Sequence, residues 1–336
     1  MSENTIRLGH GSGGTLTREL IEGTLLRYFS SSQLRGLPDS ASLEIEGAEI
    51  AFTTDTYVVD PIVFPGADIG KLAVCGTVND LAVVGAIPGF ISCGLILEEG
   101  LPQDELEVVL SSMEEAAELC QVEVVTGDTK VVPSGKADKI FINTAGIGSL
   151  PREGRRPDAP MQPGDAVLVT GPIGDHGAAV LSQRQGLNLE SEVVSDCAPL
   201  TALAHTILQV AGRVSFLRDV TRGGIATVLN EAADTADLGL VLEEDSVPVR
   251  PEVRSICELL GIDPHYLACE GRLAAVVDEE SVEEVVEAVR AVPDGEQCTI
   301  IGQVTEDYPG QLVAQTAFGT HRLIQMLSGE QLPRIC

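Results

Sequence analysis

The stretch FPGADIGKLAVCGTVNDLAVVGAIPGFISCGLIL, residues 64–97, determines the fold class. Small and apolar residues at helical spacing predict a helix over 67–86, and GFISCGLIL predicts a strand over 89–97. Residues 81–97 carry no charge and reach the lower limit of about 17 residues for a membrane-spanning helix. Four helix-breaking residues interrupt that run and favour a buried helix end, a turn and a buried strand instead: Gly85, Pro88, Gly89 and Gly94.

Helices and strands alternate on both sides of this stretch, as in an α/β protein. The patterns predict helices at 15–29 and 102–120 and strands at 49–55, 122–128 and 139–150. After a segment rich in Pro, Gly and charge at 151–164, a second α/β segment follows, with a last short helix at 318–331. We therefore predict four parts: a glycine-rich arm and helix (1–40), an N-terminal α/β domain (41–155), a C-terminal α/β domain (156–328) and a mobile tail (329–336).

The charge of the chain excludes several classes of partner. It has 21 Lys and Arg against 51 Asp and Glu, a net charge of −30. A field of that sign repels nucleic acid and anionic membrane surfaces. The N-terminus has no apolar signal region, and eight cysteines are scattered singly, so we expect a cytoplasmic protein with reduced thiols.

The glycine-rich segment GHGSGG, residues 9–14, matches the dinucleotide-binding pattern G-x-G-x-x-G. That pattern requires a preceding buried strand, and only eight residues precede it here, so we reject a Rossmann site. A loop ahead of a helix can still bind phosphate through its backbone N–H groups. An unstructured chain start explains the same glycines equally well.

Three acidic turns suggest a metal–phosphate site. Asp55 and Asp128 are predicted to end apolar strands, and Asp80 lies in an otherwise apolar helix, where an unpaired carboxylate is costly. Carboxylate oxygens suit Mg²⁺ that bridges nucleotide phosphates, and Lys130 could neutralise phosphate charge. Each aspartate alone is as well explained by strand ends and helix caps; the three together with Lys130 favour Mg²⁺.

Two further segments carry candidate chemistry. Glu270, in LACEGRLA, lies in an apolar setting that would raise its pKa towards that of a useful acid or base, although an ion pair with Arg272 or Arg250 is a competing explanation. RDVTRGG, residues 218–224, is a second possible phosphate cradle. GPIGDHG is a weaker one, in which His176 is more often a turn residue than a catalyst.

The chain ends on a thiol, in QLPRIC. A chain terminus is the least constrained part of a domain, so Cys336 is expected to be exposed and mobile. Its position excludes prenylation, which needs a cysteine fourth from the end. A terminal cysteine without function is the alternative.

Together these segments resemble a known family. HGSGG, TTDTYVV, the Asn79–Asp80 block, TGDTKVV, DVTRGG, CEG and the terminal PRIC look like the HypE family of hydrogenase maturation proteins. That family belongs to the ATP-using superfamily of aminoimidazole ribonucleotide synthetase and selenophosphate synthetase. The resemblance runs from about residue 6 to Cys336. Val220 departs from it, since a proline is expected there.

The resemblance implies a fold and an activity. The fold is a two-domain PurM-like α/β fold of the α+β type, in which the N-terminal domain binds ATP and pairs in a homodimer to form a shared β-barrel. The activity is ATP-dependent dehydration of a carbamoyl group that the carbamoyltransferase HypF places on Cys336. The resulting thiocyanate supplies cyanide, through a HypC–HypD complex, to the iron of nickel–iron hydrogenase.

The resemblance also implies residue roles. Catalytic roles fall to Cys336, Glu270 and Lys130. Mg²⁺ is implied at Asp55, Asp80 and Asp128, and nucleotide contacts are implied at those aspartates and at Gly11, Ser12, Gly13, Gly14, Asn79 and Gly127. Two alternatives stay open: a non-enzymatic thiol carrier, and a sister activity such as selenophosphate synthetase, which would use a cysteine or selenocysteine in the glycine loop, where only Ser12 stands.

Overall fold

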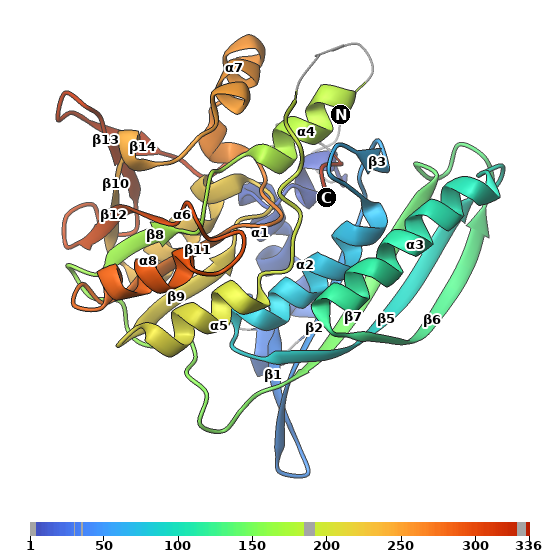
Figure 1. The fold of residues 1–336 in the computed structure, drawn as a ribbon, viewed down its shortest axis with the longest axis horizontal. Helices are drawn as coiled ribbons and strands as arrows, with labels where there is room; N and C mark the ends of the chain where they lie inside the picture. The colour runs from blue at the N-terminus through green and yellow to red at the C-terminus, as the bar shows by residue number, and fades with distance from the viewer. Residues whose placement is uncertain (1–4, 30, 35, 185–191, 328–333) are drawn as a thin grey trace.

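A five-stranded sheet and a seven-stranded sheet organise the chain (Figure 1). The computed structural model describes residues 5–29, 31–34, 36–184, 192–327 and 334–336. The smaller sheet has the order β1-β2-β7-β5-β6, in which only β5 and β6 run parallel. Its strands are β1 (Ala41–Ile45), β2 (Ala48–Tyr57), β5 (Ile87–Glu98), β6 (Glu123–Val132) and β7 (Ile140–Ser149). A small hairpin of β3 (Val63–Phe64) and β4 (Ala67–Asp68) leads into the first long helix.

That helix, α2 (Ile69–Val83), is the centre of the molecule. Asp68 caps it by accepting hydrogen bonds from the N–H groups of Gly70 and Lys71. The helix is buried almost all round because it packs on the smaller sheet, on α3 (Gln103–Cys120) and on the second unit. It ends before Gly85, whose positive φ of 81° allows the turn into β5. The uncharged run 81–97 is thus a helix end, a turn and a strand, as predicted.

The larger sheet has the order β14-β13-β10-β12-β8-β11-β9. Alternate residues of β11 (Leu273–Val277) pack on opposite faces, so both faces are covered. Helices α5 (Thr201–Val210) and α8 (Val282–Arg290) cover one face, and α6 (Gly224–Ala236) covers the other. The remaining strands are β8 (Ala166–Val169), β9 (Val214–Asp219), β10 (Gly239–Glu243), β12 (Thr299–Thr305), β13 (Leu312–Gln315) and β14 (His321–Ile324).

Several predicted elements differ from the observed ones. The helix predicted over 15–29 is α1 (Thr15–Gly23) followed by a short 3₁₀ turn. The helix predicted over 318–331 is wrong, because β14 pairs there with β13; residues 328–331 lie outside the described residues. Asp55 and Asp128 were expected at strand ends, but both lie inside strands, β2 and β6. Helices α5 and α7 (Pro251–Leu260) were not predicted.

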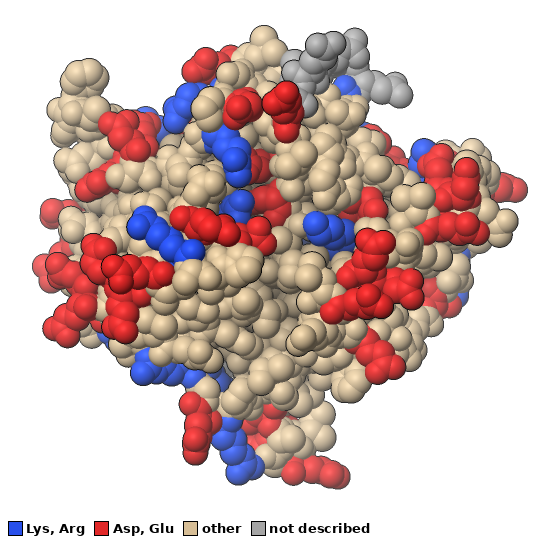
Figure 2. Space-filling model, viewed as in Figure 1, with Lys and Arg blue, Asp and Glu red and all other residues tan. Residues whose placement is uncertain are grey.

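The surface reflects the composition. Figure 2 shows acidic side chains over much of the visible face, with fewer basic ones between them. Among the residues described, no helix is both long and apolar enough to cross a membrane.

Candidate active site

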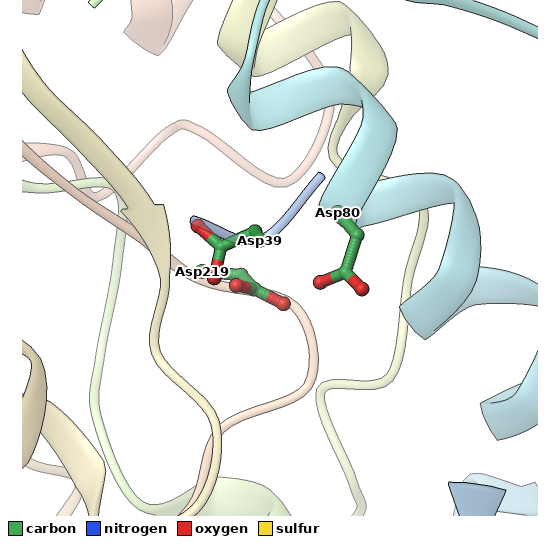
Figure 3. A group of neighbouring side chains, drawn as sticks. All are labelled: Asp39, Asp80 and Asp219. Carbon is green, nitrogen blue, oxygen red and sulfur yellow. The ribbon is translucent and has the colours of Figure 1, made fainter. Parts of the chain in front are cut away.

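Three carboxylates from separate segments meet at the junction of the two units (Figure 3). Asp39 precedes β1, Asp80 projects from α2, and Asp219 ends β9; one oxygen of each lies within 4.8 Å of the others. Asp80 Oδ2 accepts a 2.8 Å hydrogen bond from the Thr53 hydroxyl. Asp39 is ion-paired with Arg218.

The electrostatics of this cluster favour a bound cation. Burial, followed by the charges of Asp219 and Asp39, holds the pKa of Asp80 well above its usual range. Burial and the Asp39 charge raise the pKa of Asp219 to about 7. Carboxylates this close repel one another when ionised, and a divalent cation removes that repulsion. All the candidate ligands are hard oxygen atoms, so the residues fit Mg²⁺.

The resemblance implies Asp55, Asp80 and Asp128 as metal ligands. Among these three, Asp80 alone belongs to the cluster found within the described residues of a single chain. Asp55 lies nearby on β2, since its charge contributes to the raised pKa of Asp80 and of Asp219, and it is 4.0 Å from Arg222 Nη2. Asp128 lies on the exposed strand β6, ion-paired with Lys130 at 2.6 Å. Asp39 was missed because PDSA carries no pattern; Asp219 was quoted within RDVTRGG but was not assigned to metal.

The glycine segment folds against the C-terminal part of the chain. Leu8–Gly11 form a short 3₁₀ helix, and Arg222 Nη1 donates a 3.0 Å hydrogen bond to the Gly11 carbonyl. A Cβ on Gly14 would lie 2.3 Å from the Leu327 carbonyl oxygen, so only glycine fits there. Gly13 has a φ of 82° and packs on Arg222. The segment is therefore an ordered loop beside RDVTRGG.

The end of the tail is docked and Cys336 is half-buried, which corrects the expectation that this residue is exposed. Ile335 forms a β-bridge with Val59 and is 5% exposed. Its carbonyl accepts a 2.7 Å hydrogen bond from His176 Nε2. Arg334 is ion-paired with Asp138 at 2.8 Å, and its carbonyl accepts a hydrogen bond from the Asp60 N–H. The sequence could not show this docking because the anchoring residues are far away in the chain.

Docking brings the Cys336 thiol close to the Glu270 carboxyl, so that the charge of the carboxylate acts on the thiol. Burial and the charge of Glu270 hold the thiol's pKa well above its usual range. Burial, followed by the charges of Asp219 and Asp196, does the same to the pKa of Glu270. Glu270 Oε1 is buried and has no hydrogen-bond partner among the described residues. Glu270 is therefore a buried titratable group beside the terminal thiol, with one oxygen available for a further contact.

Arg222 lies between the terminal thiol and the carboxylate cluster. It lines a cavity of about 270 Å³ together with Cys336, Gly11 and Ser12. It also lines a cavity of about 760 Å³ that includes Gly13 and Asp39. The positive charge of Arg222 is favoured by Cys336 first and then by Asp55 and Glu270. The arrangement can hold a polyphosphate near the carboxylates and its reacting end near the thiol.

The remaining predicted residues have other contacts in one chain. Asn79 is buried; its amide N–H donates to the Ala198 carbonyl, and its oxygen accepts from the Leu200 N–H at 2.8 Å. A Cβ on Gly127 would lie 2.2 Å from the Cys93 carbonyl oxygen, which gives this glycine a packing role. The contact of Lys130 is with Asp128.

Known proteins resemble the chain over its whole length. Residues 38–150 match the family described as AIR synthase related protein, N-terminal domain, and residues 162–314 match the C-terminal domain of the same description. Carbamoyl dehydratase HypE of Rhodobacter capsulatus is 46% identical over 341 residues, covering 100% of this chain and 99% of the relative.

Two solved structures are also similar. A hydrogenase maturation protein HypE in complex with ATP is 48% identical, with a TM-score of 0.81, over 99% of this chain and 100% of that one. A HypE–HypF complex contains a chain 41% identical, with a TM-score of 0.85, over 92% and 99% of the two chains.

Proposed function

The chain belongs to the HypE family of AIR synthase related proteins, with its two-domain PurM-like fold, and from this we propose that it dehydrates a carbamoyl group carried on its own Cys336. The reaction uses ATP and turns the S-carboxamide into a protein thiocyanate. The proximity of the Cys336 thiol to Glu270, beside a cavity that Cys336 lines together with Gly11, Ser12 and Arg222, is the observation that carries this proposal.

The chemistry needs an activated oxygen, because an amide oxygen is a poor leaving group. The carbamoyl oxygen attacks the γ-phosphorus of ATP, ADP leaves, and the nitrogen loses one proton. Loss of the second N–H proton then forms the C≡N triple bond as the C–O bond breaks and phosphate departs. The oxygen of the lost water thus ends in inorganic phosphate.

We assign Glu270 as the base that removes the protons from the carbamoyl nitrogen. Its unpartnered Oε1 is buried beside the tail, and its raised pKa makes the carboxylate a stronger proton acceptor than an ordinary one. Arg222 offers positive charge between the phosphate site and the thiol. A metal ion held by Asp39, Asp80 and Asp219 would offset the charge of the transferring phosphoryl group.

We extend the proposal to a homodimer through the smaller sheet. Nine of the ten residues of the edge strand β6 are exposed. Three apolar residues that face one another across neighbouring strands are also open to solvent: Phe52 (39%), Ile147 (41%) and Phe90 (50%). A bare edge and an apolar sheet face are typical of an interface. Such pairing would place Asp128 and Lys130 at the partner chain.

The proposal includes partners and a place of action: HypF as carbamoyl donor, a HypC–HypD complex as cyanide acceptor, and the cytoplasm. The known complex of a related chain with HypF supports the first.

Intact-mass spectrometry tests the function. HypF first carbamoylates the protein, nucleotide is removed, and Mg²⁺–ATP is added. We expect the mass of one carbamoyl group on Cys336, followed by loss of one water only with ATP. If the mass of the carbamoyl adduct does not change after ATP is added, the dehydratase proposal is wrong and the non-enzymatic thiol carrier is the remaining alternative.

A further inference from the structure

The segment Ser195–Leu200 of the C-terminal unit is hydrogen-bonded at both ends to the N-terminal unit. At its start, the Ser195 N–H donates a 2.7 Å hydrogen bond to the Pro65 carbonyl. At its end, the Leu200 N–H donates a 2.8 Å hydrogen bond to the amide oxygen of Asn79, next to Asp80 on α2. Residues of the N-terminal unit therefore hold this segment of the C-terminal unit at both ends.

Ser195 fixes the residue that anchors the tail. His176 is fully buried, and burial lowers its pKa to about 4, so its ring is neutral. Because His176 Nε2 meets the Ile335 carbonyl, an acceptor, this nitrogen carries the proton. Nδ1 must then accept, and the Ser195 hydroxyl donates to it at 2.9 Å. Ser195 thus sets the tautomer that holds the residue next to Cys336.

Asp196 fixes the base. Its Oδ1 accepts a 3.0 Å hydrogen bond from the peptide N–H of Glu270. The Ala198 N–H donates a hydrogen bond to the Glu270 carbonyl, so the segment binds both the N–H and the carbonyl of Glu270. A Cβ on Gly271 would lie 1.8 Å from the Asp196 carbonyl oxygen, which shows how closely the two backbones approach. The Asp196 side chain is 1% exposed, and Arg272 lies 3.6 Å from it.

Two adjacent residues therefore hold the two groups that must meet in the reaction. Ser195 holds the tail in place through His176, and Asp196 holds the backbone of Glu270. We propose that Ser195 and Asp196 are positioning residues that set the distance between the substrate-bearing Cys336 and Glu270. This inference rests on the proposed function. Neither residue needs to touch the carbamoyl group, since a small displacement of thiol or base is enough to slow the reaction.

Single-turnover dehydration of the carbamoylated protein at saturating ATP tests the role of Asp196. Asp196→Ala removes the acceptor for the Glu270 N–H and should slow the reaction about tenfold or more. Asp196→Asn keeps an oxygen at that position and should recover most of the rate. ATP affinity should change little in either variant. Equal rates for Asp196→Ala and the wild type would overturn the proposal.

A matched control separates positioning from general stability. Asp165 is buried to a similar degree, accepts the Gln162 N–H at 2.8 Å and pairs with Arg213 before β8. Asp165→Ala should lower the melting temperature but leave the single-turnover rate within about twofold. A loss of rate as large as that of Asp196→Ala would show that any lost buried carboxylate slows the reaction, which contradicts the proposal.

Two further readouts do not depend on dehydration. Ser195→Ala should speed alkylation of Cys336 by iodoacetamide, because loosening of the tail exposes the half-buried thiol, whereas Ser195→Thr keeps the hydroxyl and the wild-type alkylation rate. Asp196→Ala should speed amide hydrogen exchange in the peptide that contains Glu270. If the wild type dehydrates nothing, the proposed function fails, yet these readouts still decide whether the segment positions the tail and Glu270. Unchanged alkylation and exchange would contradict it.

Discussion

The Cys336 thiol lies beside the Glu270 carboxyl, whose charge helps to hold the pKa of the thiol above its usual range, and the end of the chain is docked against Val59. The bridge of Ile335 to Val59 and the hydrogen bond from His176 hold the thiol in place. In the proposed function, this docking presents Cys336 to the active site as a tethered substrate. Tethering supplies proximity without a separate binding step.

Glu270→Gln should separate carbamoyl transfer from dehydration. Glutamine keeps the shape of the side chain but cannot take the nitrogen proton, so we expect normal formation of the Cys336 adduct and a dehydration rate lower by about a hundredfold or more. Intact-mass time courses measure both steps. Glu252→Gln, at an exposed position on α7, is the control and should behave like the wild type. Dehydration at the normal rate in Glu270→Gln would exclude Glu270 as the base.

Mg²⁺ should stabilise the fold through the carboxylate cluster. At a hundred times its Kd the ion should add about 2.7 kcal/mol, seen as a higher melting temperature at pH 8. Asp219→Asn should remove that increase, while the metal-free variant is at least as stable as the wild type because repulsion within the cluster falls. Asp245→Asn, at an exposed position, should keep the full response. An unchanged Mg²⁺ effect in Asp219→Asn would place the metal elsewhere.

The buried His176 should make the protein sensitive to acid. Its pKa is lowered to about 4 in the fold, whereas an unfolded histidine titrates near its ordinary value. The neutral ring therefore contributes stability that is present above that ordinary value and is lost as the pH falls towards 4. Between pH 7 and pH 5 the His176 contribution to the free energy of unfolding should fall by about 2 kcal/mol. Urea unfolding measures it as the change in the stability difference between the wild type and a variant without this histidine, because the raised pKa of Asp219 shifts the stability of both proteins in the opposite direction.

His176→Gln keeps a donor for the Ile335 carbonyl but does not titrate, so its stability should fall less between pH 7 and pH 5 than that of the wild type. His321→Gln, at an exposed position on β14, should retain the wild-type slope. The same slope in His176→Gln and the wild type would mean that this histidine is not the group responsible.

Charge on β6 should break the homodimer. Val131 is 66% exposed on this edge strand, and Val131→Arg would bury a guanidinium in the proposed interface. Light scattering after gel filtration should show a dimer for the wild type and a monomer for the variant. Val108→Arg, on the exposed face of α3, should stay dimeric. A dimeric Val131→Arg protein would move the interface away from β6.

The sequence singles out candidate site residues better than it predicts how they are arranged in space. Glu270, Asp80 and Cys336 stand out because a carboxylate in an apolar segment and a thiol at a chain end are each unusual in their setting. Asp39 and the docking role of His176 do not stand out, since their partners come from segments far away in the chain. Local patterns predict helices and strands, whereas a cluster built from a loop, a helix and a strand end depends on packing between them.

The same reason explains the missed and mistaken elements. The sequence pattern predicts HRLI at 321–324 as part of a helix, but this segment is a strand because Val313 and its neighbours on β13 supply the pairing. Asp55 and Asp128 were placed at strand ends because the apolar runs stop there, while the observed strands continue through polar residues. Pairing with a neighbouring strand, rather than hydrophobicity alone, sets where these strands end.

The most direct test follows the oxygen atom. Protein carbamoylated on Cys336 with a heavy-oxygen label in the carbamoyl group is treated with Mg²⁺–ATP in ordinary water, and the inorganic phosphate is collected for mass spectrometry. Dehydration by phosphorylation of the amide predicts one labelled oxygen in the phosphate for each thiocyanate formed on Cys336. Unlabelled phosphate, or label that stays on the protein after ATP is consumed, would contradict it.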